Sequence, residues 1–215
     1  MSSVVISGDT SGSITLQAPA VSGTNTLTLP VATDTLVGKA TTDTLTNKSI
    51  VATQLTGTIA AARLPAGTVL QVVSTTKTDT FSTASTSYVD ITGLSVSITP
   101  SSSSSKIYIV VSISGSENAG FGYQLVRGST AICIGDSGGG SRKQASGGMS
   151  VRDTNGVNNG IVNYLDSPAT TSSTTYKIQM YVPSSTGYIN RTYGDVDAAY
   201  TIRSASTITV MEIAA

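Results

Sequence analysis

The chain has 215 residues with no net charge, and only 11% of them are charged. Without a surplus of Lys or Arg to neutralise phosphates, the composition argues against nucleic-acid binding. There is no histidine and only one cysteine. These counts exclude an intrachain disulfide and weaken the case for a transition-metal site, so we expect no metal and no cofactor. No apolar run approaches the roughly 20 residues that span a bilayer, so we expect no membrane insertion.

Residues 1–66 contain no aromatic side chain and only short apolar pieces. In Ile14–Leu16 and Leu27–Leu29, apolar residues alternate with Thr, which is the period of a β-strand. One chain cannot build a core from such pieces, whereas three copies wound around one axis could place Leu and Ile inward and Thr outward. We therefore predict an extended, intertwined stem over residues 1–66, with a disordered polar leader as the alternative.

Residues 67–215 hold both phenylalanines and all nine tyrosines. Residues 106–113 alternate between apolar and other side chains, which predicts a strand with one buried face. The pairs Thr92-Gly93 and Gly128-Ser129 each predict a hairpin turn between two strands. About ten short strands broken by Gly, Ser and Pro predict an all-β head, an antiparallel β-sandwich of jelly-roll type. Further strands are expected over residues 69–73, 161–165, 174–182, 198–202 and 206–213.

Several strings resemble parts of the slender, trimeric fibre proteins of tailed bacteriophages. TNTLTLP at residues 24–30 and DTLTNK at residues 43–48 are similar to a segment near the start of those fibres. RLPAGTVLQV, DITGLSVSITP and STITVME, which begin at residues 63, 90 and 206, are similar to the C-terminal domains of some of them. The resemblance implies a homotrimer that is a virion component. Its stem, residues 1–66, would attach to a baseplate, tail or capsid protein, and its head, residues 67–215, would adsorb to a glycan or protein of the host surface.

The expected location is the virion, with assembly in the host cytoplasm and release by lysis. The first nine residues lack the basic and apolar regions of a signal peptide, which agrees with this expectation. Two other functions stay open. A capsid head fibre or decoration protein would share the stem-and-head design. A glycan depolymerase would need paired carboxylates in a groove, but the 12 acidic residues are scattered, so we expect no enzymatic activity.

The string GDSGG at residues 135–139 matches the nucleophile loop of chymotrypsin-like serine proteases. Attack by a serine hydroxyl requires a neighbouring base, which is histidine in that family, and this chain has none. We therefore interpret the string as a Gly/Ser loop at the end of a strand, with Asp136 in a turn.

A first candidate for ligand binding is the cluster Tyr188, Asn190, Arg191 and Tyr193. Tyrosine combined with amide and guanidinium groups can stack on sugars and hydrogen-bond to their hydroxyls. The alternative is that these tyrosines pack at a trimer interface or on the edge of the sandwich.

A second candidate is the Gly-rich stretch of residues 135–160, which carries Arg142, Lys143 and Arg152. Long irregular loops on a β-scaffold often bind ligands. The alternative is a mobile loop without a specific partner.

Overall fold

The computed structural model divides the chain into two units, Met1–Thr56 and Gly57–Ala215. The predicted boundary between residues 66 and 67 lies slightly further along the chain. In the first unit, two short antiparallel strands pair with each other, and the register joins Ser3 to Gln17 and Ser7 to Ser13. Most of the predicted stem lies outside the described residues, so its intertwining stays a prediction. The structure describes residues 3–7, 11–17, 24, 49, 51, 57, 59–60, 63–150 and 155–215.

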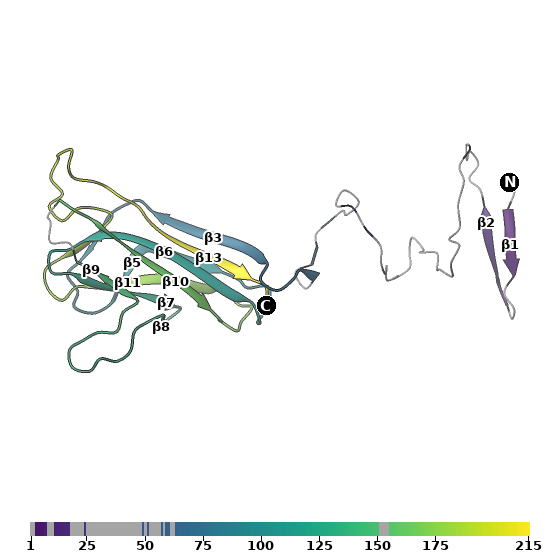
Figure 1. The fold of residues 1–215 in the computed structure, drawn as a ribbon, viewed down its shortest axis with the longest axis horizontal. Coiled ribbons are helices and arrows are strands. Elements are labelled where there is room, and N and C mark those ends of the chain that lie inside the picture. The colour runs from purple at the N-terminus through teal and green to yellow at the C-terminus, as the bar shows by residue number, and fades with distance from the viewer. Residues whose placement is uncertain are drawn as a thin grey trace. The chain divides into compact units, whose positions relative to one another are not determined.

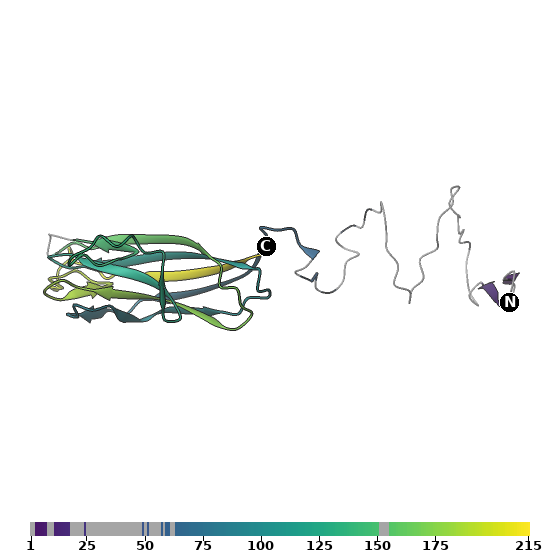
Figure 2. The same ribbon diagram turned by 90° about the horizontal axis from the view of Figure 1, so that it is seen from below.

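The second unit contains two antiparallel sheets, as predicted, and we call this pair of sheets the sandwich (Figure 1). Its strands run along one common direction (Figure 2). The strands of the chain are β1 (Ser3–Ser7), β2 (Ser13–Gln17), β3 (Val69–Lys77), β4 (Phe81–Thr83), β5 (Val89–Ile98), β6 (Lys106–Ser116), β7 (Phe121–Arg127), β8 (Thr130–Ile132), β9 (Gly147–Met149), β10 (Asn158–Asp166), β11 (Thr174–Tyr181), β12 (Gly187–Ile189) and β13 (Ser206–Ile213).

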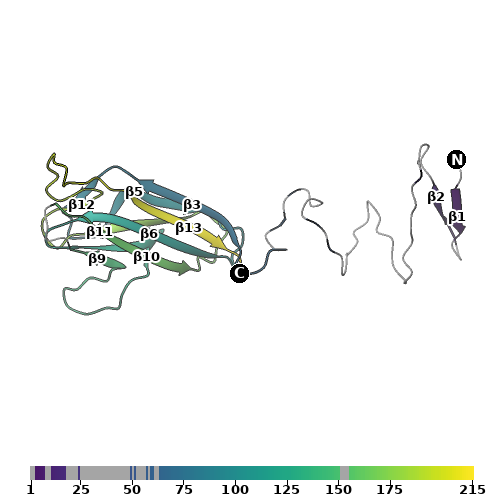
Figure 3. The ribbon, with the colours of Figure 1, turned by 45° about the horizontal axis from the view of Figure 1, so that its top comes forward.

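The six-stranded sheet places β3, β13, β6 and β10 side by side (Figure 3). The short strands β12 and β4 extend this sheet, because β12 pairs with Gly115 and Ser116 of β6, beyond the last residue paired with β13. In the five-stranded sheet the order is β5, β11 and β7, and both β8 and β9 pair with the other edge of β7. The sequential strands β5, β6 and β7 therefore alternate between the sheets.

One apolar core lies between the two sheets. Strand β6 contributes alternate residues, as its sequence predicts, and each such side chain stabilises the fold by about 1.5 to 3 kcal/mol through burial. The largest fully buried apolar side chains come from six strands of the two sheets. They include Leu94, Ile107, Ile109, Ile113, Leu125, Tyr176, Ile178, Met180, Ile189 and Ile208.

The sandwich has two distinct ends. At the end that we call the base, the Gly67 N–H donates to Ala214 O at 2.8 Å and the Ala214 N–H donates to Thr68 O at 2.9 Å. The chain thus enters the sandwich beside the end of its last strand. The opposite end, which we call the tip, contains the turn between β6 and β7 at residues 117–120.

Several strand predictions are confirmed, namely those for residues 106–113, 174–182 and 206–213. The hairpin at Gly128-Ser129 is also confirmed. Strands β7 and β8 pair up to Arg127 and Thr130, and Gly128 has a φ of +60°, as the first residue of a primed turn requires.

Two predictions are wrong. Thr92-Gly93 is no hairpin turn but lies within β5, where Gly93 has a φ of +83°. The register with β11 shifts there, between the Lys177 and Gln179 pairings, so the glycine marks a β-bulge. Residues 198–202 form a turn instead of a strand, since the Thr201 N–H and hydroxyl both donate to Ala198 O, at 3.0 and 2.9 Å.

Candidate functional site

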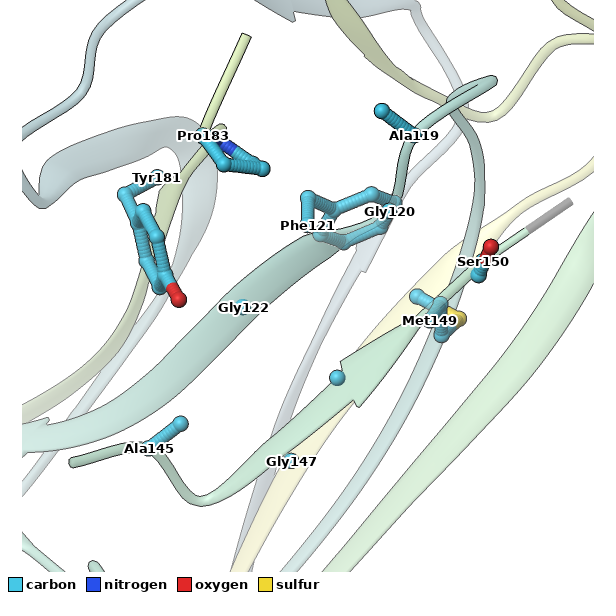
Figure 4. A pocket seen from close by; sticks show the side chains of 11 residues that line it. Ala119, Gly120, Phe121, Gly122, Ala145, Gly147, Met149, Ser150, Tyr181 and Pro183 are labelled. Carbon is cyan, nitrogen blue, oxygen red and sulfur yellow. The ribbon is translucent and has the colours of Figure 1, made fainter. Parts of the chain in front are cut away.

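A groove lies at the tip of the sandwich. It consists of two adjoining hollows that share Tyr181 and Ala145. The first, of about 420 Å³, lies among β7, β9 and Pro183 (Figure 4). The second, of about 600 Å³, lies against the loop of residues 135–145. We call the two hollows together the tyrosine groove.

Tyr181 forms a wall of this groove because a glycine lies beneath its ring. It is the last residue of β11 and pairs with Gly122 of β7. A Cβ atom at Gly122 would collide with the Tyr181 ring, so only glycine lets the ring lie against this backbone. Figure 4 shows the ring beside Gly122 and Pro183, across from Phe121. The Tyr88 ring meets Tyr181 edge-on, with centroids 4.9 Å apart, and helps to fix its orientation.

The loop of residues 135–145 is closed at its neck by hydrogen bonds. The Gly135 N–H donates to Ala145 O at 3.1 Å, and Gln144 Nε2 donates to Gly135 O at 2.7 Å. The Tyr88 hydroxyl donates to Gln144 O at 2.6 Å. Burial, together with the nearby Tyr181, raises the pKa of Tyr88 to about 12, so the hydroxyl keeps its proton at neutral pH. Tyr88 therefore ties this loop to the wall of the groove.

Arg142 and Lys143 both line the second hollow, as the prediction of a binding loop requires. Lys143 Nζ lies 5.4 Å from the centroid of the Tyr181 ring, which is a cation–π distance. The Arg142 side chain lies against Gly138, where an added Cβ would be 3.3 Å from Nε. The third predicted cation, Arg152, lies outside the described residues.

The cluster of Tyr188, Arg191 and Tyr193 does come together in space. The Arg191 guanidinium lies 4.2 Å from the Tyr188 ring centroid, and the Tyr188 and Tyr193 centroids are 5.6 Å apart. Arg191 Nη1 also pairs with Asp195 Oδ2 at 3.3 Å, and Asp195 pairs in turn with Arg203. The cation and the rings thus satisfy one another, which favours a structural role for this cluster.

Asn190, the fourth residue predicted for that cluster, does not face a ligand. It is fully buried with a φ of +62°. Its Nδ2 donates to Lys77 O at 2.8 Å and to Asp79 O at 3.0 Å, and its Oδ1 accepts from Ser206 Oγ at 2.6 Å. Every polar atom of the side chain is therefore used inside the fold, and Asn190 joins the ends of three strands.

Glu117 begins the turn between β6 and β7. Two later residues of this turn, Ala119 and Gly120, line the groove. It is fully buried, and neither carboxylate oxygen has a hydrogen-bond partner with good geometry. Burial raises the pKa of Glu117, and the backbone N–H groups of Ala119 and Gly120 offset only part of that rise. No sequence pattern marked this residue.

The protease-like string lies in the exposed loop of the groove. In residues 63–150 and 155–215 no three metal-ligating side chains gather, and no described helix is long and apolar enough to cross a membrane. No protein-family model matches the chain, and no curated protein is significantly similar to it. The chemistry of the groove itself must therefore carry the functional argument.

Proposed function

We propose that the sandwich binds glycans of a host surface in the tyrosine groove, and that the chain is a fibre protein of a bacteriophage particle. The observation that carries glycan binding is the fixed Tyr181 face with Arg142 and Lys143 beside it. Aromatic rings pack on the apolar faces of sugars, while side-chain donors bind their hydroxyls. The virion role rests on the resemblance of residues 24–30, 43–48 and the three later strings to phage fibres.

We propose binding without cleavage. Asp136 is the one acidic side chain that lines the described part of the groove. Glycoside hydrolysis ordinarily uses a pair of carboxyl groups across the scissile bond. The glycan depolymerase alternative would be supported by new reducing ends after incubation with a bound polysaccharide.

The proposal also includes a fold type and an assembly. The first is a jelly roll, because the chain alternates between sheets of order β3, β13, β6, β10 and β5, β11, β7, β8. The second is a homotrimer attached by residues 1–66 to a baseplate, tail or capsid protein. Three groove-bearing heads on one fibre would convert modest single-site affinity into avidity.

The outer face of the six-stranded sheet supports contact between copies of this chain. Met211 lies opposite both Val72 and Tyr108 in register, and Leu165 lies opposite Tyr108. This row thus crosses four strands, and Val72 and Leu165 are 57% and 50% exposed. The next row contains Ser74, Thr209, Val110 and Asn163, so neither row carries a charge. Three copies of such an uncharged face can pack around a threefold axis, since no like charges would meet there.

Light scattering on the full chain tests this assembly. Three chain masses are expected for the wild type, and Leu165→Glu should shift the mass toward one chain by placing a charge in the contact. A trimer unaffected by Leu165→Glu would remove the outer face from the interface, and a monomeric wild type would overturn the homotrimer.

Glycan binding is tested on an array of bacterial surface polysaccharides. Tyr181→Ala should reduce binding at least tenfold, because it removes the aromatic wall. Tyr200→Ala is the matched control, since Tyr200 is 63% exposed and does not line the groove. A loss in Tyr188→Ala with normal binding in Tyr181→Ala would move the site to the other tyrosine cluster. No binding by the wild type would overturn the function.

Attachment to the particle is tested by labelling whole virions with an antibody against the sandwich. Label on the tail supports a tail fibre. Label restricted to the shell would favour the capsid head fibre or decoration protein.

A further inference from the structure

The cations of the sandwich differ in whether they have an acidic partner. Within the described residues, Lys77, Arg127, Lys177, Arg191 and Arg203 each form an ion pair. Arg142 and Lys143 form none there, although Asp136 lines the same hollow. Two adjacent cations that have no carboxylate partner among the described residues thus line a hollow that also has an aromatic wall.

Both cations are exposed, but each makes a contact within the groove. The Arg142 side chain lies against Gly138, where a larger residue would displace it. Lys143 is held over Tyr181, and the loop that carries both is fastened at its neck by Gln144 and Tyr88. A loop closed at its neck limits how far both cations can move from Tyr181.

We propose that the tyrosine groove selects acidic saccharides, with the sugar carboxylate bound by Arg142 and Lys143 and the ring packed on Tyr181. This inference rests on the proposed function and narrows its ligand class. Guanidinium binds a carboxylate through two parallel hydrogen bonds, and the ammonium group adds a second charge-assisted contact. Asp136 can accept a hydrogen bond from a sugar hydroxyl, which favours a monoacidic residue over a densely charged one.

The second hollow is large enough for this role. Its volume of about 600 Å³ lies within the roughly 300 to 1,000 Å³ that is usual for small-molecule sites. The adjoining hollow of about 420 Å³, which has a glycine-rich floor, extends the groove past Tyr181. A short oligosaccharide can therefore lie across Tyr181, with its acidic residue on the side of Arg142.

The test uses the full chain and titration calorimetry with three acidic probes, namely hexasaccharides of galacturonate, mannuronate and sialate. Each probe is paired with its carboxyl-reduced, neutral counterpart. At least one acidic probe should bind tenfold or more tightly than its neutral counterpart, and the difference should shrink as salt is raised.

Variants of the full chain locate the recognition. Arg142→Gln and Lys143→Gln should each lower affinity for the acidic probe about tenfold and affinity for the neutral counterpart by less, because glutamine still donates to hydroxyls but carries no charge. Lys106→Gln is the matched control, since Lys106 is an exposed lysine that forms no ion pair with the described residues and lies opposite Ile213 at the base. All three substitutions are at exposed positions, and unfolding curves are to be recorded to check that the variants are folded.

The outcomes separate this inference from the proposed function. Equal binding of acidic and neutral probes would overturn the acidic preference and leave glycan binding in place. An acidic preference that survives in the Arg142→Gln, Lys143→Gln double variant would overturn the assignment of these residues. If no acidic probe binds, the inference is overturned. If the polysaccharide array is negative as well, the proposal of glycan binding is overturned too.

Discussion

Glu212 and Glu117 are both fully buried, but they lie at opposite ends of the sandwich, about 30 Å apart along β6. At the base, Glu212 accepts hydrogen bonds from Gln71 Nε2 at 2.6 Å and from the Ser101 N–H and hydroxyl at 2.7 and 2.6 Å. At the tip, Glu117 has no such partners. The base is therefore built for stability, whereas the tip keeps an unsatisfied carboxyl group next to the groove.

Because of this contrast, the two carboxyl groups stabilise the fold in opposite pH ranges. Burial alone would raise the pKa of Glu212, but hydrogen bonds from Ser101, Gln71 and Ser105 outweigh burial and lower it. Its stabilising contribution is present above the ordinary pKa of about 4.3 and is lost as pH falls through the lowered value. The pKa of Glu117 is raised, so its contribution is favourable at low pH and is lost as pH rises through the raised value. Unsatisfied buried groups often gather near functional surfaces.

Removing the Glu212 carboxylate from the base should have the largest effect on stability. Glu212→Ala leaves the donors of Gln71 and Ser101 without an acceptor, and we expect a loss of about 3 to 5 kcal/mol in the free energy of unfolding. Urea denaturation at pH 7 measures it. Glu212→Gln keeps one carbonyl oxygen and should lose less. A loss below about 1 kcal/mol for Glu212→Ala would show that the base does not depend on this network.

Asn190 tests whether the tip also contains a satisfied network. Asn190→Ala removes the bonds to Lys77 O, Asp79 O and Ser206, and it places an alanine at a φ of +62°. We expect a loss of about 2 to 4 kcal/mol in unfolding free energy, with unchanged glycan affinity at temperatures where the variant is folded. Asn190→Gly should recover part of the loss, since glycine tolerates this φ. An Asn190→Ala variant with normal stability and no glycan binding would show that Asn190 belongs to the ligand site.

Glu117→Gln should stabilise the fold, whereas the substitutions of Glu212 and Asn190 should destabilise it. Removing a buried, unpaired charge should stabilise the fold by about 1 to 3 kcal/mol at pH values above the raised pKa of Glu117. The gain should shrink as pH falls and vanish below about 4.3, because the wild-type side chain is then protonated in both folded and unfolded states. Thermal unfolding from pH 4 to pH 8 measures it. A variant less stable than the wild type at pH 8 would contradict the absence of partners around Glu117.

Tyr88→Phe should have the smallest effect. It removes only the hydrogen bond to Gln144 O and should cost about 1 kcal/mol or less in global stability. The local effect should be clearer, since the neck of the loop loses one of its bonds. Hydrogen exchange of the Gly135 amide, which donates to Ala145 O, should become faster. The amides of β6 serve as the control, and equal acceleration there would mean that the substitution weakened the whole sandwich.

Sequence patterns predicted the elements whose residues alternate over many positions. Strand β6 has four fully buried residues in phase, and the Gly128-Ser129 turn joins two strands that are neighbours in sequence. Gly93 was misread because a glycine between apolar residues suits a turn and a bulge equally well. Only the register with β11, which is far away in sequence, decides between them.

The groove was predicted only in part, for a similar reason. The loop with Arg142 and Lys143 was recognisable from its glycines and cations. Tyr181 was not recognised, because its role depends on Gly122 lying beneath it. That pairing joins β7 and β11, which are separated in the sequence by β8, β9, β10 and the loop of residues 135–145. Asn190 was placed at the surface because a polar residue among tyrosines looks exposed, whereas the structure buries it and bonds it to residues far away in the sequence.

The entry of the chain at Gly67, beside Ala214, has a mechanical consequence. If a ligand holds the tip while the rest of the chain pulls at residue 67, the load acts along the strands and reaches β3 first. The ladder between β3 and β13, which extends from Val69 to Lys77, then resists in shear, with its hydrogen bonds loaded together instead of one after another. Single-molecule pulling between residue 67 and the tip should therefore require more force than peeling β3 sideways from β13. If the chain is the fibre protein proposed above, a particle tethered to a moving cell would benefit from that anisotropy.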